Sequence, residues 1–280
     1  MPIVACVQLN GSSDLERNLR TTEELVRRAA AAGAVLVATP EATTWLGPHD
    51  RKVELAEPVD GPTHRRLADL AAELGIHLLI GGVIERHPDP AVAAEQAYNT
   101  SLLFDPTGRL VARYRKIHLF DVDLREMGGV SFAESRRTAR GDEVVVADTP
   151  WGRLGMSICF DLRFPELYAA QVARGATILA VPSAFTERTG RDHWHALLRA
   201  RAIENQCWVL APAQWGPHDD RGLRHSYGHS LIVDPWGTIV AECGDGEGIC
   251  LAELVPGRVE EVRRRIPMGV RYDPLPFLKG

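Results

Sequence analysis

The sequence contains few lysines, few cysteines, no long hydrophobic run and no excess of positive charge. Its first residues, MPIVACVQLN, lack the basic start and the apolar core of a signal peptide, and no stretch approaches the roughly 18 consecutive apolar residues of a membrane span. A formal net charge of -5 gives no electrostatic footprint for nucleic acid. We therefore expect a cytoplasmic protein that binds neither membranes nor nucleic acids.

The cysteines are too few and too scattered to define a disulfide framework. There are five, an odd number, and they lack the close paired spacing of a structural zinc site. They are Cys6, Cys159, Cys207, Cys243 and Cys250. We expect reduced thiols, most of which pack as structural residues.

The chain has 280 residues, of which 45% are hydrophobic, so it is long enough to bury one large core. Helical and strand patterns alternate along it. Asp14 is suited to begin a helix that Gly33 ends, and the apolar run 34–38 follows as a strand. A second helix over 62–74 precedes a second apolar strand over 77–84. This alternation predicts an α/β fold with buried strands.

An internal repeat indicates two similar halves. Residues 98–112, YNTSLLFDPTGRLVA, and residues 227–241, YGHSLIVDPWGTIVA, are identical at 8 of 15 positions and read as β-hairpins. The strands at 3–9 and 152–158 also correspond. The alternative is two unrelated α/β units that share turn residues. Two packed sheets with helices outside would accommodate both halves in one globule.

We expect one domain over residues 1–255. The connection over 117–141 is too long for a plain loop and is a candidate functional segment, and a shorter connection lies near 86–97. Residues 256–280, which carry Pro267, Pro274 and Pro276, are predicted to form an extended tail, which packs on the domain or on a partner subunit.

Cys159 differs from the other cysteines because it stands at a strand-to-helix turn. It ends the apolar strand LGMSIC, and Pro165 and Gly175 suit the start and the end of the next helix. Backbone N–H groups and the helix dipole at such a turn favour a thiolate and can receive an oxyanion. The alternative is a small core residue, which Cys6 and Cys207, inside apolar runs, fit well.

Three further residues are candidates for the chemistry. Glu41 follows the strand VLVATP, and a partly buried carboxylate there can act as the base for a thiol. Lys116 is one of only three lysines among 32 basic residues, and its ammonium, with the Phe160 N–H, can hold an oxyanion. Glu134, in the long connection, could orient Lys116 or a bound water as a second carboxylate. An exposed glutamate and a surface lysine are the alternatives.

The histidines show no metal-binding spacing. His193 and His195 lie in a helical pattern that points them in different directions, and no H-E-x-x-H motif accompanies them. His118 and the pair His225 and His229 offer no better pattern. Neither a metal nor an organic cofactor is expected, and no glycine-rich phosphate loop is present.

Glu41, Lys116 and Cys159 together resemble the Glu-Lys-Cys triad of the nitrilase (carbon-nitrogen hydrolase) superfamily, and the resemblance covers nearly the whole chain. Within the superfamily, the chain is most similar to the Nit branch. The segments that carry this resemblance are YRKIHLFD, ICFDLRFPE, VPSAFTERTGRDHW, LLRARAIENQCWVLAPAQWG and YGHSLIVDPWGT. Glu134 falls where this branch places a second glutamate.

The resemblance implies a four-layer α-β-β-α sandwich with internal duplication, associated as a homodimer or a larger homo-oligomer. It also implies hydrolysis of a small amide through a cysteine thioester, with release of ammonia. Deaminated glutathione and other ω-amides of keto or dicarboxylic acids are the expected substrates. Arg163 and the segment with Ser183, Phe185 and Thr186 lie where they could contact a substrate carboxylate.

Two alternatives remain open. The same triad could cleave N-carbamoyl amides or nitriles, and a protein of this fold could be a noncatalytic scaffold, which the three reactive residue types argue against. The chain departs from many relatives at Phe160, where the backbone would supply the donor, and in the loop 121–131. The loop change leaves the substrate open, because loops at the rim of a sheet set specificity.

Overall fold

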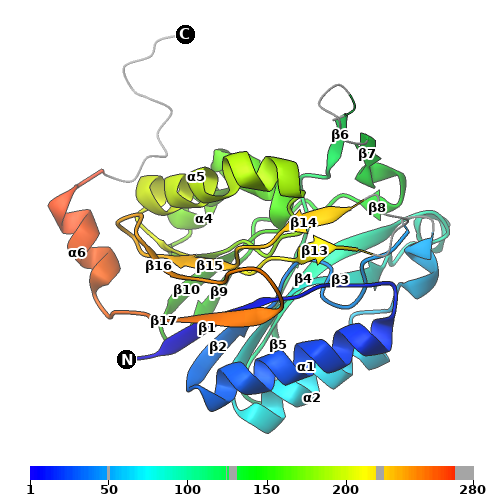
Figure 1. Ribbon diagram of the computed structural model, residues 1–280, viewed down its shortest axis with the longest axis horizontal. Helices are drawn as coiled ribbons and strands as arrows, with labels where there is room; N and C mark the ends of the chain where they lie inside the picture. Colours follow the sequence, from blue (N-terminus) through cyan, green and yellow to red (C-terminus); the bar gives the residue numbers. More distant parts are fainter. Residues whose placement is uncertain (49–50, 124, 126–130, 219–223, 269–280) are drawn as a thin grey trace.

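Two β-sheets pack face to face, with helices on the outer face of each, as expected from the sequence (Figure 1). The computed structural model describes residues 1–48, 51–123, 125, 131–218 and 224–268. In Figure 1 helices α1 (Leu15–Ala31) and α2 (Pro62–Leu74) cover one sheet, and α4 (Pro165–Ala173) and α5 (Glu187–Asn205) cover the other. This arrangement confirms the α-β-β-α sandwich.

The first sheet has the strand order β17-β1-β2-β3-β4-β5, with β8 beside β4. β1, β2 and β3 are parallel, and β4 and β5 continue the sheet as an antiparallel hairpin. The strands span Ile3–Gln8 (β1), Ala34–Ala38 (β2), His77–Arg86 (β3), Ala97–Phe104 (β4), Leu110–Arg115 (β5), Thr138–Ala139 (β8) and Gly248–Glu253 (β17).

The second sheet repeats this topology in the order β16-β15-β12-β11-β10-β9. β10, β11 and β12 are parallel, and β15 and β16 follow antiparallel, so the two halves of the chain correspond strand for strand. The predicted duplication is therefore confirmed. The strands span Val146–Thr149 (β9), Gly152–Met156 (β10), Ala176–Ala180 (β11), Trp208–Ala211 (β12), Leu231–Val233 (β15) and Ile239–Glu242 (β16).

Helices α1, α2, α4 and α5 connect the parallel strands, and the predicted start of α1 and the predicted end of α2 are confirmed. Asp14 accepts a hydrogen bond from the Arg17 N–H and caps α1, and Gly75 ends α2 with a left-handed φ of 63°. The helices span Leu15–Ala31 (α1), Val53–Leu55 (η2), Pro62–Leu74 (α2), Pro90–Ala93 (α3), Glu134–Arg136 (η4), Cys159–Arg163 (η5), Pro165–Ala173 (α4), Glu187–Asn205 (α5) and Arg258–Arg265 (α6). None of the helices in the described residues is both long and apolar enough to cross a membrane.

One core lies between the sheets and extends under α4 and α5, and a second lies between the first sheet and helices α1 and α2. Side chains of both halves meet in the first core. Leu36 and Leu79 come from one sheet and Met156 and Leu210 from the other, and all four are fully buried. The apolar strand runs thus supply the driving force that fixes the two sheets, and with them the strand ends, relative to each other.

The C-terminal segment differs from the expected extended tail. Residues 258–265 form helix α6, whose Val259 and Val262 lie one turn apart and are buried. The prolines that suggested an extended chain all follow this helix. Residues 269–280 lie outside the described residues, and the domain boundary at 255 stays a prediction.

The long connection over 117–141 contains a short antiparallel pair, β6 (Asp121–Asp123) and β7 (Ser131–Ala133), followed by η4. A similar small pair, β13 (Trp215–Pro217) and β14 (His225–Tyr227), precedes the hairpin of the second half. Most of the divergent loop over 121–131 lies outside the described residues.

Candidate active site

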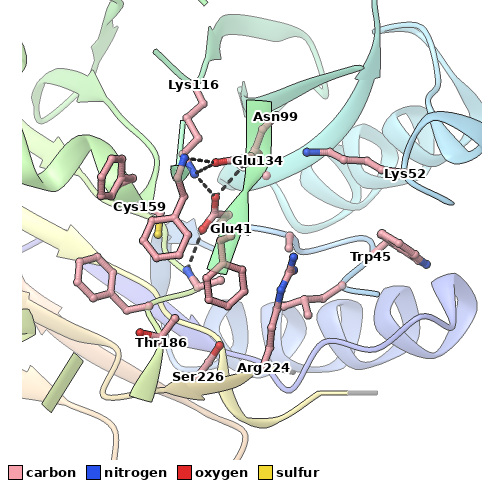
Figure 2. Close-up of a pocket in the computed structure, with 18 of the residues that line it drawn as sticks. Glu41, Trp45, Lys52, Asn99, Lys116, Glu134, Cys159, Thr186, Arg224 and Ser226 are labelled. Carbon is pink, nitrogen blue, oxygen red and sulfur yellow. Dashed lines mark hydrogen bonds and ion pairs between the residues drawn. The ribbon is translucent and has the colours of Figure 1, made fainter. Parts of the chain in front are cut away.

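Glu41, Lys116 and Cys159 meet in one cavity because they follow strands that end at the same edge of the sandwich (Figure 2). Glu41 comes just after β2, Lys116 directly after β5 and Cys159 after β10. β5 runs antiparallel to β4, which runs antiparallel to β3, so β5 points the same way as the parallel strands. The structure therefore brings together the three residues that the sequence singled out.

The Lys116 ammonium lies at the centre of a buried charge network. Its Nζ donates to Glu41 Oε1 at 2.8 Å and to Glu134 Oε2 at 2.9 Å, and the side chain is 2% exposed. Burial disfavours the cation, but the two carboxylates overcompensate, so the pKa of Lys116 lies well above its usual value. Lys116 is thus a fixed cation, and the predicted second glutamate is its partner.

Asn99 joins the two carboxylates from β4. Its Nδ2 donates to Glu41 Oε1 at 2.8 Å and to Glu134 Oε1 at 3.3 Å. Glu134 also accepts from the Phe120 N–H at 2.8 Å. Burial alone would raise the pKa of Glu134, but the positive charges of Lys116 and Lys52 have the larger effect and lower the pKa to about 2. Both acids are therefore held in place, and Glu134 is an anion at neutral pH.

Glu41 is positioned from both halves of the chain. Its Oε2 accepts the Ala184 N–H at 3.0 Å, and its carbonyl accepts Gln214 Nε2 at 2.9 Å. A side chain at Gly82 would collide with the backbone next to Glu41, at 2.7 Å from the Ala42 nitrogen. Glycine at this position lets β3 approach the loop that carries the carboxylate.

Cys159 begins η5 in a left-handed conformation, with a φ of 49° that non-glycine residues rarely adopt. Its N–H donates to the Pro182 carbonyl at 2.9 Å, which anchors the turn. The thiol lies beside the Glu41 carboxylate and near the Ala184 N–H. The strand-to-helix turn predicted for this residue is therefore present.

The thiolate that the sequence led us to expect at Cys159 is not favoured in the structure. Burial, followed by the charge of Glu41, raises the pKa of Cys159 well above its usual value, and the opposing effect of Lys116 is smaller. The short helix η5 and its dipole do not overcome desolvation. The resting nucleophile is therefore a neutral thiol beside a carboxylate that can accept its proton.

A buried carboxylate that the sequence analysis missed, Asp161, holds the turn of Cys159. It accepts the Tyr114 hydroxyl at 2.7 Å, the Ile158 N–H at 2.8 Å, and both the N–H and the Nδ1 of His118 at 2.9 and 2.7 Å. These contacts tie η5 to the segment that carries Lys116. A charged residue two positions after a candidate nucleophile, inside an apolar run, was the signal available in the sequence.

Three of the four predicted substrate contacts line the cavity. Arg163 lies over the Phe185 ring with its guanidinium carbon 5.2 Å from the centroid, and Thr186 continues the same wall. Ser183 does not line the cavity; its hydroxyl donates to the Val181 carbonyl at 3.0 Å and is fully buried. The turn after β11 points Ser183 inward, so its role is structural.

Two further cations line the cavity and were not among the residues predicted from the sequence. Lys52 is buried and donates from Nζ to Thr138 Oγ1 at 2.7 Å, and burial lowers its pKa to about 8. Arg224 lies beside the ring of Phe132, with its guanidinium carbon 5.7 Å from the centroid. The scarcity of lysine that singled out Lys116 was an equally good signal for Lys52.

The arrangement suits acyl transfer. A thiol, an acceptor for its proton and a fixed ammonium lie side by side in a cavity that five aromatic side chains also line. An ammonium has three N–H donors, and Lys116 gives two of them to the carboxylates, which leaves one for a substrate oxygen. The aromatic side chains are Trp45, Phe120, Phe132, Phe160 and Phe185.

Comparison with known proteins agrees with this chemistry. The deaminated glutathione amidase of Synechocystis sp. is 42% identical over 268 residues, which cover 95% of this chain and 96% of that protein. The crystal structure of Saccharomyces cerevisiae Nit3, a member of branch 10 of the nitrilase superfamily, is 36% identical with a TM-score of 0.83 over 95% of this chain and 94% of that one.

An amidase from Nesterenkonia sp. AN1 is 26% identical, with a TM-score of 0.78 over 95% of this chain and 98% of that one, and in that structure acrylamide is attached to the active-site cysteine. The family model for carbon-nitrogen hydrolases matches residues 3–264. The chain belongs to the carbon-nitrogen hydrolase family.

Proposed function

We propose that this hydrolase cleaves its amide through a thioester on Cys159, with Glu41 as the proton carrier. The observation that carries this proposal is the position of the thiol beside Glu41, whose carboxylate is held by Lys116, Asn99 and the Ala184 N–H. Because the resting thiol is neutral, Glu41 takes the proton as the sulfur attacks the carbonyl carbon. The C–S bond forms as the C=O π bond opens.

The negative oxygen of the tetrahedral intermediate is stabilised by Lys116 and by the Phe160 N–H. Lys116 retains one N–H donor, and its fixed charge needs no reorganisation when the oxyanion develops. Phe160 lies in the first turn of η5, where N–H groups have no partner within the helix. Glu134 keeps the ammonium in place and takes no proton itself.

Collapse of the intermediate breaks the C–N bond, and Glu41 returns its proton to the leaving nitrogen. Water then enters, Glu41 accepts one of its protons, and hydroxide attacks the thioester. The C–S bond breaks, the sulfur recovers a proton from Glu41, and a carboxylic acid leaves. One amide and one water thus give one acid and one amine or ammonia.

The substrate that we propose is an anionic amide, of which deaminated glutathione is the first candidate. The relative from Synechocystis is named for that activity. Support from this chain comes from three cationic side chains in the cavity wall, Lys52, Arg163 and Arg224, while both acids are engaged by Lys116. An arginine beside the nucleophile can bind a carboxylate with two hydrogen bonds.

The leaving group depends on the substrate. Glutathione contains no primary amide, so hydrolysis of its deaminated form releases an amine, whereas an ω-amide such as α-ketoglutaramate releases ammonia. The sequence-based expectation of ammonia release therefore applies only to primary amides. A suitable assay measures the acid product by mass spectrometry and ammonia in parallel.

The test compares deaminated glutathione, α-ketoglutaramate, an N-carbamoyl amino acid and a simple nitrile at equal concentrations. We expect the highest kcat/KM for one of the two keto-acid amides, and an increased KM for that substrate in Arg163→Lys. A higher kcat/KM for the N-carbamoyl compound or the nitrile would assign the protein to another activity of the same triad. No turnover of any of them would favour the scaffold alternative.

We also propose a homodimer or larger homo-oligomer in the cytoplasm. Ile203 of α5 and Trp236, which flank Gly237, are exposed large apolar side chains next to the edge strand β16. All five cysteines are free and buried, which suits a reducing compartment. Light scattering should give at least twice the chain mass, and Trp236→Lys should lower it; a monomeric wild-type protein would contradict the proposal.

A further inference from the structure

Two histidines and a glutamate from three elements of the second half converge on one point outside the active-site cavity. His195 lies in α5, His229 between β14 and β15, and Glu242 at the end of β16. Glu242 Oε1 lies 2.9 Å from His195 Nε2 and 2.7 Å from His229 Nδ1. The three ligand atoms are all within 4.8 Å of one another.

The backbone around His229 is built to present its ring to this point. His229 adopts a left-handed φ of 56°, and its carbonyl accepts the indole N–H of the buried Trp194 at 2.8 Å. Its ring stacks on Tyr227 with centroids 4.4 Å apart, and the same tyrosine meets His195 edge-on. An uncommon conformation with this much support indicates that the position of the ring is imposed by the fold.

The equivalent segment of the first half has a different backbone conformation. There the repeat runs through β4 as regular strand, and Thr100 takes the place of His229. In the second half β14 ends at Tyr227 and β15 begins at Leu231, so the strand is interrupted at the histidine. The interruption swings His229 toward α5 and away from the ladder.

Two imidazoles and one carboxylate are a ligand set that zinc commonly uses, with water in the remaining position. Bond lengths of about 2.0–2.2 Å in a tetrahedral site place neighbouring ligand atoms roughly 3.4 Å apart. The two distances to Glu242 are slightly shorter than this, so a small rotation of the carboxylate would admit an ion. Side-chain exposures of 31% and 29% for the histidines and 32% for Glu242 leave one side open to water.

We propose that His195, His229 and Glu242 bind a divalent transition-metal ion of the Zn²⁺ class. The ion takes the place of the protons on His195 Nε2 and His229 Nδ1 that face Glu242. Each of these protons moves to the other nitrogen of its ring or is released. None of the three residues lines the cavity of Cys159, so the site is distinct from the hydrolytic one. The site links α5 to the β15–β16 hairpin. The chain that precedes His229 includes His225 and Ser226, which line the cavity.

The test uses Co²⁺, whose visible absorption reports a site of this type, and Zn²⁺ titration calorimetry. Measurements on the wild-type protein and on Cys159→Ala separate this site from the thiol, because thiolate ligation adds a near-ultraviolet charge-transfer band. We expect one ion per chain in both proteins, and a rise in Tm with Zn²⁺. His229→Gln and Glu242→Gln should each weaken binding at least about tenfold.

His193→Gln is the matched control, because His193 is in the same helix as His195 but outside the cluster. It should bind Co²⁺ as the wild-type protein does. The proposal is overturned if Co²⁺ shows no visible band at millimolar concentration, or if His193→Gln and His229→Gln have equal affinities. Binding that disappears only in Cys159→Ala would place the ion at the thiol and equally overturn it. None of these outcomes depends on the hydrolytic activity.

Discussion

Replacement of Glu134 by glutamine tests the buried charge network most quantitatively. The change keeps the shape of the side chain but removes the charge that faces the Lys116 ammonium at 2.9 Å. The pKa of Glu134 falls from 4.5 to about 2 in the folded protein, which corresponds to about 3 kcal/mol of stability at pH 7. This value agrees with the general cost of about 3–5 kcal/mol for removing one partner of a buried ion pair.

The sign of the pH dependence follows from the lowered pKa. Glu134 stabilises the folded state fully above the unfolded pKa of 4.5, and this contribution is lost as the pH falls toward about 2. The difference in unfolding free energy between the wild-type protein and Glu134→Gln should therefore shrink from about 3 kcal/mol at pH 7 to about 1 kcal/mol at pH 3. The amide hydrolysis rate at pH 7 should fall by about 10²-fold, because Lys116 is no longer held in place.

Urea unfolding of both proteins at several pH values between 7 and 3 measures this difference. Glu73→Gln is a matched control, since Glu73 forms an exposed ion pair with Arg27, and such pairs contribute little. A difference between wild-type and Glu134→Gln that does not change with pH would refute the assigned ionisation of Glu134. Equal stability at pH 7 would refute the role of the network.

Three further predictions concern single residues of the site. Lys116→Arg should lower kcat by about 10²-fold despite the retained charge, because a planar guanidinium cannot donate to two carboxylates and an oxyanion as the ammonium does; unchanged kcat in the hydrolysis assay would contradict this. Asp161→Asn should lower the free energy of unfolding in urea by about 2 kcal/mol or more, because the turn of Cys159 loses an acceptor of four hydrogen bonds. It should also lower kcat more than it raises KM. A change in KM alone would show that Asp161 does not position the nucleophile. Asn99→Ala should lower kcat and leave the protein folded, and wild-type kinetics would remove its role in orienting Glu41.

The layout of the fold and the reactive residues could be predicted from the sequence because both follow from short-range patterns. The apolar runs before Glu41 and Cys159 fix the strands, and parallel strands place their ends at one edge of a sheet. The repeated hairpin indicated two halves with the same strand order, which the two sheets confirm. Glu134 could be placed only through the resemblance to known hydrolases, since nothing local distinguishes it from a loop residue.

The direction of individual side chains could not be predicted. Ser183 and Thr186 stand in the same segment, but the turn after β11 buries Ser183 and leaves Thr186 in the cavity wall. Asn99 lies in a predicted strand, and its contact with Glu41 depends on the close approach that Gly82 allows. Helix α6 was missed because the prolines after it dominated the pattern, although Val259 and Val262 have helical spacing.

The protonation state of the Cys159 thiol also could not be predicted from the sequence. A cysteine at the start of a helix suggests a lowered pKa, whereas the burial of this thiol and the proximity of Glu41 raise it. The direction of the shift depends on how completely water is excluded, which only the packed structure shows.

The proposed reaction requires Cys159 to form a thioester with the acyl part of the substrate. The most direct measurement is mass spectrometry of the protein quenched during turnover of its best amide, with Cys159→Ala and Cys207→Ala compared; Cys207 is a buried thiol in the core and outside the cavity. We expect a mass increase equal to the acyl group on the peptide that holds Cys159, no adduct and no turnover in Cys159→Ala, and near wild-type turnover in Cys207→Ala. Hydrolysis at the wild-type rate by folded Cys159→Ala would contradict it.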